Sequence, residues 1–582
     1  MPVKNIDKLI ETSLSRISEI EKKMWQNDYD DALLSQYHAE FQQLEQLKAL
    51  QGDDRRHEFV IVIPVADRPQ HLQSCVRSLL NLCKAFTYGG YSKNKYSKVS
   101  VIIADDSKEH FNIAKHKSIA AECNLQGLST LYFGPDDQLD QVALLSKSSK
   151  NILSKIIGNY SSEAFYHKGP SITRNITYLE LNKISCSTGN VLFYFVDSDQ
   201  EFRIKISTSN GDKNIYGCNY LYYLDQIFTR TTAKILTGKV VGDPPVSPSV
   251  MAGNFLEDVI SFLHRIAEFN PNLPCQFHQK RPQDSNEASY HDMAALFGFT
   301  PSLESFQYQC SIKGEHNNAR CFTHFTSKLS RFFYGEHPTR KTYYRHEDIL
   351  NSVQAARTVY TGNYIFKPEL LKYFIPFAPL KLRMAGPVLG RIIKSELKEQ
   401  FVSANLPLLH KRTVRDSGQS EFRPGIFSNT VHIDLSGEFE RQFYGDVMLF
   451  SMEKFITQGY PQQTISESQV LHILDSTHIR LLQQYNGKRL EISSKLALLK
   501  SLNQDKTNWW ANISNYAEGN EYLKLFISNI EYNFGENALG YKLINSAENK
   551  KIIFESMIES ITSYAEASLA WQDELTKSCF QN

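Results

Sequence analysis

The chain has 582 residues, 41% of them hydrophobic and 22% charged, and its formal net charge is +1. This length predicts two to four globular domains, and the small charge argues against a surface that coats nucleic acid. No apolar stretch reaches the roughly 18 residues of a membrane span, and the first residues lack the apolar core of a signal peptide. Nine cysteines without paired close spacing favour reduced thiols, so we expect a cytoplasmic protein.

The N-terminal region is predicted to be helical. Residues 5–50 place apolar side chains at helical spacing on both sides of a polar break at 27–31. This pattern predicts two amphipathic helices that form a hairpin over residues 1–55. The hairpin either pairs with another subunit, which would give a homo-oligomer, or packs onto its own chain.

Three apolar runs further along predict strands that are buried on both faces. They cover residues 58–64, 99–104 and 191–196, and a helical pattern at 69–82 joins the first run to the second. Strand, helix and strand in this order predict a βαβ unit of a nucleotide-binding sheet. A short run at 131–133 adds a fourth predicted strand.

Acidic residues follow two of these strands. Asp105 and Asp106 come after the second run, and Asp197-Ser198-Asp199 comes after the third. Ligand sites in open α/β sheets lie at the carboxyl ends of the strands. Carboxylates there suit a hard divalent cation that is shared with the phosphate oxygens of a substrate. The sequence therefore predicts a site for a metal and a diphosphate.

A helix start lies between the second and third of these runs. Gly169-Pro170-Ser171-Ile172-Thr173-Arg174-Asn175 breaks the preceding loop and opens an apolar helical pattern. The whole order over residues 58–202 resembles the GT-A glycosyltransferases, particularly the large family 2 type. The resemblance implies an α/β fold with a Rossmann-like domain over residues 56–440 that binds a nucleotide diphosphate sugar.

Two regions fall outside the family core. Residues 203–340 read as an insertion that the core does not need, and the helical periodicity beyond about residue 450 predicts a C-terminal helical domain over 441–582.

The resemblance also implies the roles of individual residues. Catalysis would involve Asp199 and Arg174, and a metal, Mn²⁺ or Mg²⁺, would be held by Asp197, Asp199 and His410. The donor would be a UDP-sugar or a GDP-sugar, with UDP favoured, and the acceptor a hydroxyl of a glycan, glycolipid or small molecule in polysaccharide biosynthesis. The implied contacts to the nucleotide sugar are Pro64, Ala66, Arg68, Asp105, Asp106, Arg174, Asp197 and Lys411, with Arg412 an alternative to Lys411.

The family's usual catalytic base is missing. Residues 361–377 resemble the acceptor-side segment, but the acidic pair that follows in the family is absent from 382–391. In inverting enzymes one of those acids deprotonates the acceptor hydroxyl. Either Glu347 or Asp348 supplies this function, or the enzyme is retaining and needs no such base.

Two other functions fit parts of the pattern. A sugar nucleotidyltransferase would also use a Rossmann-like sheet with metal-binding carboxylates, but it would carry a Gly-rich basic loop where this chain has residues 65–69. A catalytically inactive GT-A-like scaffold in polysaccharide assembly is the alternative that involves no catalysis, and the missing acid supports it.

The insertion contains two further features. The proline-rich loop at 242–248 is either an acceptor wall beside the Asp-x-Asp strand or a plain surface loop. Cys310, His316, Cys321 and His324 offer zinc ligands, although their spacing matches no standard zinc finger and no short Cys-x-x-Cys accompanies them.

Overall fold

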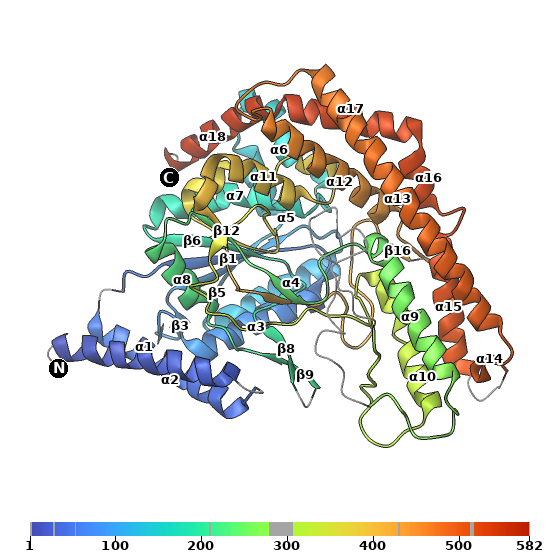
Figure 1. The fold of residues 1–582 in the computed structure, drawn as a ribbon. Helices are drawn as coiled ribbons and strands as arrows, with labels where there is room; N and C mark the ends of the chain where they lie inside the picture. Colours follow the sequence, from blue (N-terminus) through green and yellow to red (C-terminus); the bar gives the residue numbers. More distant parts are fainter. Residues whose placement is uncertain are drawn as a thin grey trace.

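The structure is a computed structural model that describes residues 3–26, 29–52, 54–208, 211–278, 306–428, 431–512 and 517–580. It confirms the α/β class: helices cover both faces of a large sheet (Figure 1). None of the helices in these ranges combines the length and the apolar character that a membrane crossing requires.

Eight strands of the described chain form the main sheet. They are β1 (Glu58–Val65), β4 (Val99–Asp105), β5 (Ser129–Phe133), β6 (Val191–Val196), β10 (Ile235–Thr237), β12 (Gln354–Ala355), β13 (Asn363–Phe366) and β14 (Phe401–Ser403). Their order is β12-β14-β10-β13-β6-β1-β4-β5. Strands β5, β4, β1 and β6 are parallel neighbours, whereas β13 is antiparallel to β6 and to β10. All four strands that the apolar runs predict are therefore present.

The central strands contribute to two hydrophobic cores, one on each face of the sheet. In β1, Val60 and Val62 point into one core, whereas Phe59, Ile61 and Ile63 point into the other. Strand β6 alternates in the same way. Because both faces are covered, both sets of alternating side chains are apolar, which explains the uninterrupted apolar runs in the sequence.

One core includes the N-terminal hairpin. The helices that contribute to it are α1 (Val3–Gln26), α2 (Asp31–Gln51), α3 (Pro69–Phe86), α4 (His110–Leu125) and α8 (Tyr220–Arg230). Phe41 of α2 packs against Phe86 and Tyr222 at ring-centroid distances of 5.4 and 5.1 Å. Of the two alternatives left by the sequence, the structure shows the hairpin packed on its own chain.

The other core joins the sheet to the C-terminal helices, which lie on the opposite side from the hairpin (Figure 1). Trp571 of the last helix is fully buried, and its Nε1 donates a hydrogen bond to the Leu371 carbonyl at 2.9 Å. Residues 441–582 therefore share a core with the sheet. The helices on this side are α5 (Pro135–Ala143), α6 (Lys147–Ile157), α7 (Pro170–Ser187), α9 (Ala252–Ala267), α10 (Asn318–Thr326), α11 (Ala385–Leu397), α12 (Ser436–Thr457), α13 (Glu467–Gln504), α14 (Trp509–Asn512), α15 (Ala517–Phe534), α16 (Leu539–Asn545), α17 (Ala547–Thr562) and α18 (Tyr564–Phe580).

Residues 203–340 are more integral than the sequence indicated. They supply β10, which lies inside the main sheet between β13 and β14. They also supply β11 (Val240–Gly242), which pairs with β15 (Leu408–His410) in a small sheet completed by β7 (Gln200–Glu201). Strands of two or three residues are too short to show a period in the sequence. The remaining short strands are β2 (Tyr91–Ser92), β3 (Lys95–Tyr96), β8 (Ile204–Thr208), β9 (Gly211–Ile215), β16 (Phe427–Ser428) and β17 (Ile433–Asp434).

The cysteines differ in part from the expectation of reduced thiols. Cys186 is disulfide-bonded. The free thiols among the described residues are those of Cys75, Cys83, Cys123, Cys218, Cys275, Cys310 and Cys321.

A buried carboxyl group connects α12 to α13. Asp446 accepts hydrogen bonds from Gln442 Nε2 at 2.9 Å and from Tyr485 Oη at 2.6 Å. Burial raises the pKa of Asp446 to about 7, although these two hydrogen bonds and the charge of Arg383 act in the opposite direction.

This pKa predicts a pH-dependent stability. An unfolded Asp has a pKa of about 4, so the folded state holds a proton that the unfolded state releases, and stability falls as the pH rises from about 4 to about 7. In the wild type this fall in the free energy of unfolding is on the order of 4 kcal/mol, and Asp446→Asn should abolish it. Urea unfolding should therefore show that the free energy of unfolding decreases less between pH 5 and pH 8 in Asp446→Asn than in the wild type. The exposed Asp416→Asn is the control; equal decreases in the wild type and Asp446→Asn would contradict the assignment.

Candidate functional site

A cavity of about 760 Å³ lies at the carboxyl ends of β1, β4 and β6. Its lining includes Pro64 to Ala66 at the end of β1, Asp106 after β4, and Asp197 to Asp199 after β6. The N-terminal ends of α7 and α11 and the first turn of α12 complete the walls. The position at the carboxyl edge of parallel strands is the one expected from the sequence.

The close packing of β13 fixes the start of the Asp-x-Asp segment. Asp197 N donates to the Gly362 carbonyl at 3.4 Å. A Cβ atom at position 362 would lie 2.6 Å from Asp197 Oδ2, so only glycine leaves room for this carboxylate. The acceptor-side segment and the acidic segment are thus in direct contact.

Asp199 is surrounded by cationic side chains. Its Oδ2 lies 3.2 Å from Arg68 Nη2, 3.5 Å from Arg412 Nη1 and 3.7 Å from His410 Nε2. Burial alone would raise the pKa of Asp199, but Arg68, His410 and Arg412 hold it well below its ordinary value. The buried carboxylate is therefore ionised.

Asp197 has a different environment. Its side chain is one-third exposed, and its Oδ1 accepts a hydrogen bond from Nη2 of the buried Arg174 on α7. Asp197 thus faces both the cavity and Arg174, whereas Asp199 and His410 lie together.

Three arginines of the cavity have unused hydrogen-bond donors. The Nε–H groups of Arg68, Arg174 and Arg412 are buried and have no partner among the described residues. Burying a hydrogen-bond donor that has no partner costs about 1–3 kcal/mol of folding free energy, and the cost is larger when the donor is charged. All three side chains line the cavity, so their guanidinium groups are placed to contact a ligand with several acceptor oxygens.

The cavity wall carries more cations than anions. Eight arginines and one lysine line it, against three aspartates and one glutamate. Burial, with like charges nearby, lowers the pKa of Arg423 to about 9 and that of Arg441 to about 10. An anion bound in the cavity would relieve this repulsion. The electrostatics therefore favour a ligand with more than one negative charge.

The two acids at the end of β4 hold the local structure together. Asp106 lines the cavity, but its oxygens accept from Lys168 Nζ at 2.6 Å and from Gly169 N at 2.9 Å. Asp105 is fully buried outside the lining and accepts from Tyr132 Oη and pairs with His116 Nδ1, both at 2.8 Å. Asp106 thereby anchors the Gly169 turn, where φ is +103°, and positions the start of α7.

The structure does not bring three other predicted residues to the cavity lining. Lys411 donates to Glu201 Oε1 at 3.0 Å, and the neighbouring Arg412 lines the cavity in its place. The segment with Glu347 and Asp348 is exposed and follows His346, whose ring stacks on Trp25 of α1 at 5.4 Å. These two acids therefore lie at the contact with the N-terminal hairpin.

Glu438 is a cavity residue that the sequence did not reveal. It lies in the first turn of α12, is 1% exposed, and accepts from Arg383 Nη1 and Arg423 Nη2 through Oε1. Burial opposes ionisation, but Arg423 and Arg383 lower the pKa of Glu438. Its Oε2 has no hydrogen-bond partner among the described residues. An ionised carboxylate with one unpartnered oxygen thus lies beside Arg383, next to the segment where the family's acid is missing.

The donor atoms beside Asp199 fit a divalent cation. His410 Nδ1 donates to the Asp243 carbonyl at 2.7 Å, which leaves Nε2 as the ring atom that can bind a metal. The Asp199 carboxylate is a ligand suited to Mn²⁺ or Mg²⁺, and the His410 nitrogen lies beside it. Arg68 and Arg412 contact the same carboxylate, so a cation would compete with them for it.

The proline-rich loop after β11 contributes to the wall. Pro245 and Val246 line the cavity. Asp243 accepts from Arg412 N at 2.8 Å through Oδ2, while its carbonyl orients His410. The loop thus holds two residues of the site in place.

No protein-family model matches the chain, and no curated protein sequence is similar to it. Among solved structures, the mannosyltransferase PcManGT from Pyrobaculum calidifontis, in complex with GDP-Man and Mn²⁺, aligns over 87% of this chain and 97% of its own. The identity is 8% and the TM-score is 0.31. A TM-score of this size does not define a shared fold, and the case for a function rests on the cavity.

The neighbouring cations Arg412 and Lys411 provide a matched test of the anion site. Arg412→Gln should weaken the binding of inorganic pyrophosphate about 10- to 100-fold, because a charge-assisted hydrogen bond contributes about 1.5–3 kcal/mol. Lys411→Gln should bind as the wild type does, since its side chain contacts Glu201 outside the lining. Isothermal titration calorimetry measures both affinities. Equal losses in the two variants would show a general effect of charge instead of a built site.

Proposed function

We propose that the protein is a glycosyltransferase that moves a sugar from a nucleotide diphosphate sugar to a hydroxyl group of an acceptor. The observation that carries the proposal is the set of three buried arginines, Arg68, Arg174 and Arg412, whose Nε–H groups have no partner among the described residues. They surround the Asp-x-Asp segment at the carboxyl edge of the parallel strands. A diphosphate offers the oxygens and the charge that this arrangement needs.

The cavity also suits the rest of a nucleotide sugar. Its volume of about 760 Å³ lies within the range of roughly 300–1,000 Å³ that is typical of ligand pockets. The nucleotide would contact Pro64, Ala66 and Arg68 after β1. We favour a UDP-sugar, with a GDP-sugar as the alternative donor.

The arginines would act on the leaving group. As the bond from the anomeric carbon to the diphosphate breaks, negative charge grows on the phosphate oxygens, and Arg68, Arg174 and Arg412 are positioned to stabilise it. Asp199 and His410 would hold a divalent cation, and this ion would supply further neutralisation of the diphosphate. Asp199 also keeps Arg68 and Arg412 in place before the donor binds, and Asp197 holds Arg174.

Glu438 is our candidate for the base of an inverting reaction. Its ionised carboxylate has one unpartnered oxygen and lies against Arg383, whereas Glu347 and Asp348 lie outside the cavity lining. Glu438 would accept the proton of the acceptor hydroxyl while that oxygen attacks the anomeric carbon. This assignment requires a product of inverted configuration, which NMR of the anomeric proton measures.

A panel of nucleotide sugars tests the proposal directly. The protein, incubated with Mn²⁺ or Mg²⁺ and each sugar nucleotide in turn, should slowly release nucleoside diphosphate from its own donor. Release of pyrophosphate from a nucleoside triphosphate and a sugar phosphate would instead show a nucleotidyltransferase. No turnover with any donor, despite pyrophosphate binding, would support a scaffold without catalysis.

Asp199→Ala separates catalysis from anion binding. We expect at least a 100-fold loss of transfer, comparable with the loss of one charge-stabilising group in other enzymes. Binding of pyrophosphate without metal should not weaken, because the substitution removes a negative charge from the site. Calorimetry and a transfer assay give the two readouts, and Asp416→Ala is the exposed control. Full transfer activity in Asp199→Ala would end the proposal.

Glu438→Gln tests the candidate base. Transfer should fall about 10²- to 10⁴-fold, the usual contribution of general base catalysis, while the Kd of the donor stays within a few-fold of the wild-type value. Glu347→Gln and Asp348→Asn should remain active because neither side chain lines the cavity. Retained activity in Glu438→Gln, with loss in either of the other two, would return the role to residues 347–348.

A further inference from the structure

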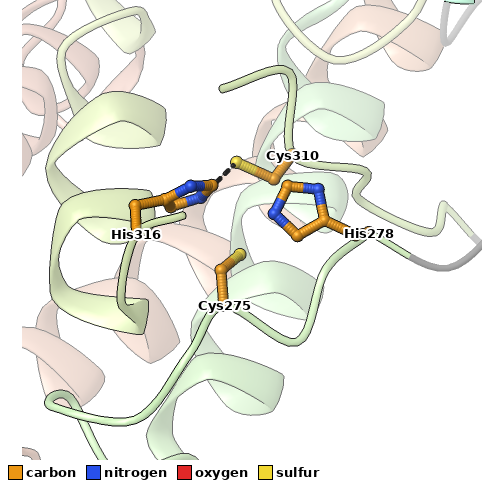
Figure 2. Close-up of side chains that lie close together, drawn as sticks. All are labelled: Cys275, His278, Cys310 and His316. Atoms are coloured by element: carbon orange, nitrogen blue, oxygen red, sulfur yellow. Dashed lines mark hydrogen bonds between the residues drawn. The ribbon is translucent and has the colours of Figure 1, made fainter. Parts of the chain in front are cut away.

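A second cluster of potential metal ligands lies away from the cavity. Cys275, His278, Cys310 and His316 each offer one ligand atom, and these four atoms all lie within 4.8 Å of one another. Figure 2 shows the four side chains gathered around a common point between two chain segments. Among the described residues, no other group of three or more His, Cys, Asp or Glu side chains converges in this way. None of these four residues lines the cavity of the proposed active site.

The histidine on the second segment is already oriented as a ligand. His316 Nδ1 lies 2.9 Å from the Gly314 carbonyl, which can only accept a hydrogen bond, so Nδ1 carries the proton. The other ring nitrogen, Nε2, faces Cys310 Sγ at 3.2 Å. Histidines that bind metals characteristically donate their other ring N–H to a carbonyl or carboxylate in this way.

Main-chain hydrogen bonds hold the two segments in register. Cys275 N donates to the His316 carbonyl at 2.9 Å, and Cys310 N donates to the Phe277 carbonyl at 2.8 Å. An antiparallel bridge joins Pro274 to Asn317. Cys275, Cys310 and His316 are thus held close together by backbone contacts that do not depend on a metal.

The long separation in sequence between the Cys275–His278 pair and the Cys310–His316 pair explains why the sequence did not reveal the set. Cys275 and His278 are separated by two residues and Cys310 and His316 by five, which are separations seen in structural zinc sites. The sequence offers Cys310 and His316 as zinc ligands together with Cys321 and His324. The latter two lie in α10, where His324 contacts Tyr308 Oη at 3.5 Å. The structure instead supplies Cys275 and His278 as the other two ligands.

We infer that Cys275, His278, Cys310 and His316 bind one Zn²⁺ ion in a structural site. Two thiolates and two imidazole nitrogens are a ligand set that selects zinc. Four protein ligands fill a tetrahedral shell, so no position remains for water or substrate. The ion would cross-link the segment after α9 to the segment before α10, and this role does not depend on the proposed glycosyltransferase activity.

Metal analysis of the full-length protein tests the site. The chain, purified without a polyhistidine tag and dialysed, should contain about one zinc per chain by mass spectrometry of the metals. Cys310→Ser and His316→Ala should lose this zinc, whereas Cys83→Ser, which removes a buried free thiol of α3, should retain it. Asp199→Ala should also retain it, so that zinc in the cavity is distinguished from zinc in the cluster. Wild-type protein without zinc, or a Cys310→Ser variant that keeps all of it, would overturn the inference.

Cobalt substitution and one further pair of variants test the identity of the ligands. Co²⁺ in place of zinc should give the intense d–d absorption of a tetrahedral site and a thiolate-to-cobalt charge-transfer band. Cys321 interacts with the thiols of Cys275 and Cys310, so it is the natural competitor of His278 for the fourth position. His278→Ala should lose the tetrahedral spectrum and Cys321→Ser should keep it. The reverse result, or an octahedral spectrum in the wild type, would overturn the ligand set proposed here.

Discussion

The positive charge buried around Asp199 is the constraint on which the site depends. Several guanidinium groups are removed from water here, and such groups are stable only where carboxylates or carbonyls compensate them. Asp197, Asp199 and Glu438 provide the carboxylates. They come from the end of β6 and from the first turn of α12. Segments that are far apart in the sequence must therefore assemble before the cavity exists.

This requirement gives the C-terminal helices a direct role. Helix α12 supplies Glu438 and Arg441, and Gly445 lets it approach closely, since a Cβ there would lie 2.4 Å from the Arg383 carbonyl. The same helix belongs to the hydrophobic core that reaches the sheet. Helix α12 thus contributes directly to the wall of the site.

The sequence predicted those parts of the molecule that are encoded locally. The buried strands β1, β4 and β6 and the acids at their ends follow from continuous apolar runs, and the resemblance to a family added Arg68 and Arg174 to the site. Glu438 could not be found this way, because nothing in its local pattern distinguishes it from any acid in the first turn of a helix. The choice between Lys411 and Arg412 depended on which side chain faces inward after β15. The strand period of two puts Arg412 on the same side as His410, which identifies it once His410 is placed.

Chains of buried polar contacts connect the cavity to the region of the cysteine and histidine cluster. Asp243, which holds His410 and Arg412, pairs with Lys341. The adjacent Arg340 forms a two-point ion pair with Asp258 of α9 at 2.7 and 2.8 Å. Helix α9 then leads to Cys275. Ion pairs of this two-point geometry hold their partners in one arrangement, so α9 serves as a rigid link. A cross-link after the end of α9 would therefore restrict the motion of α9. Through Arg340 and Lys341, it would also restrict the motion of the loop that contains Asp243.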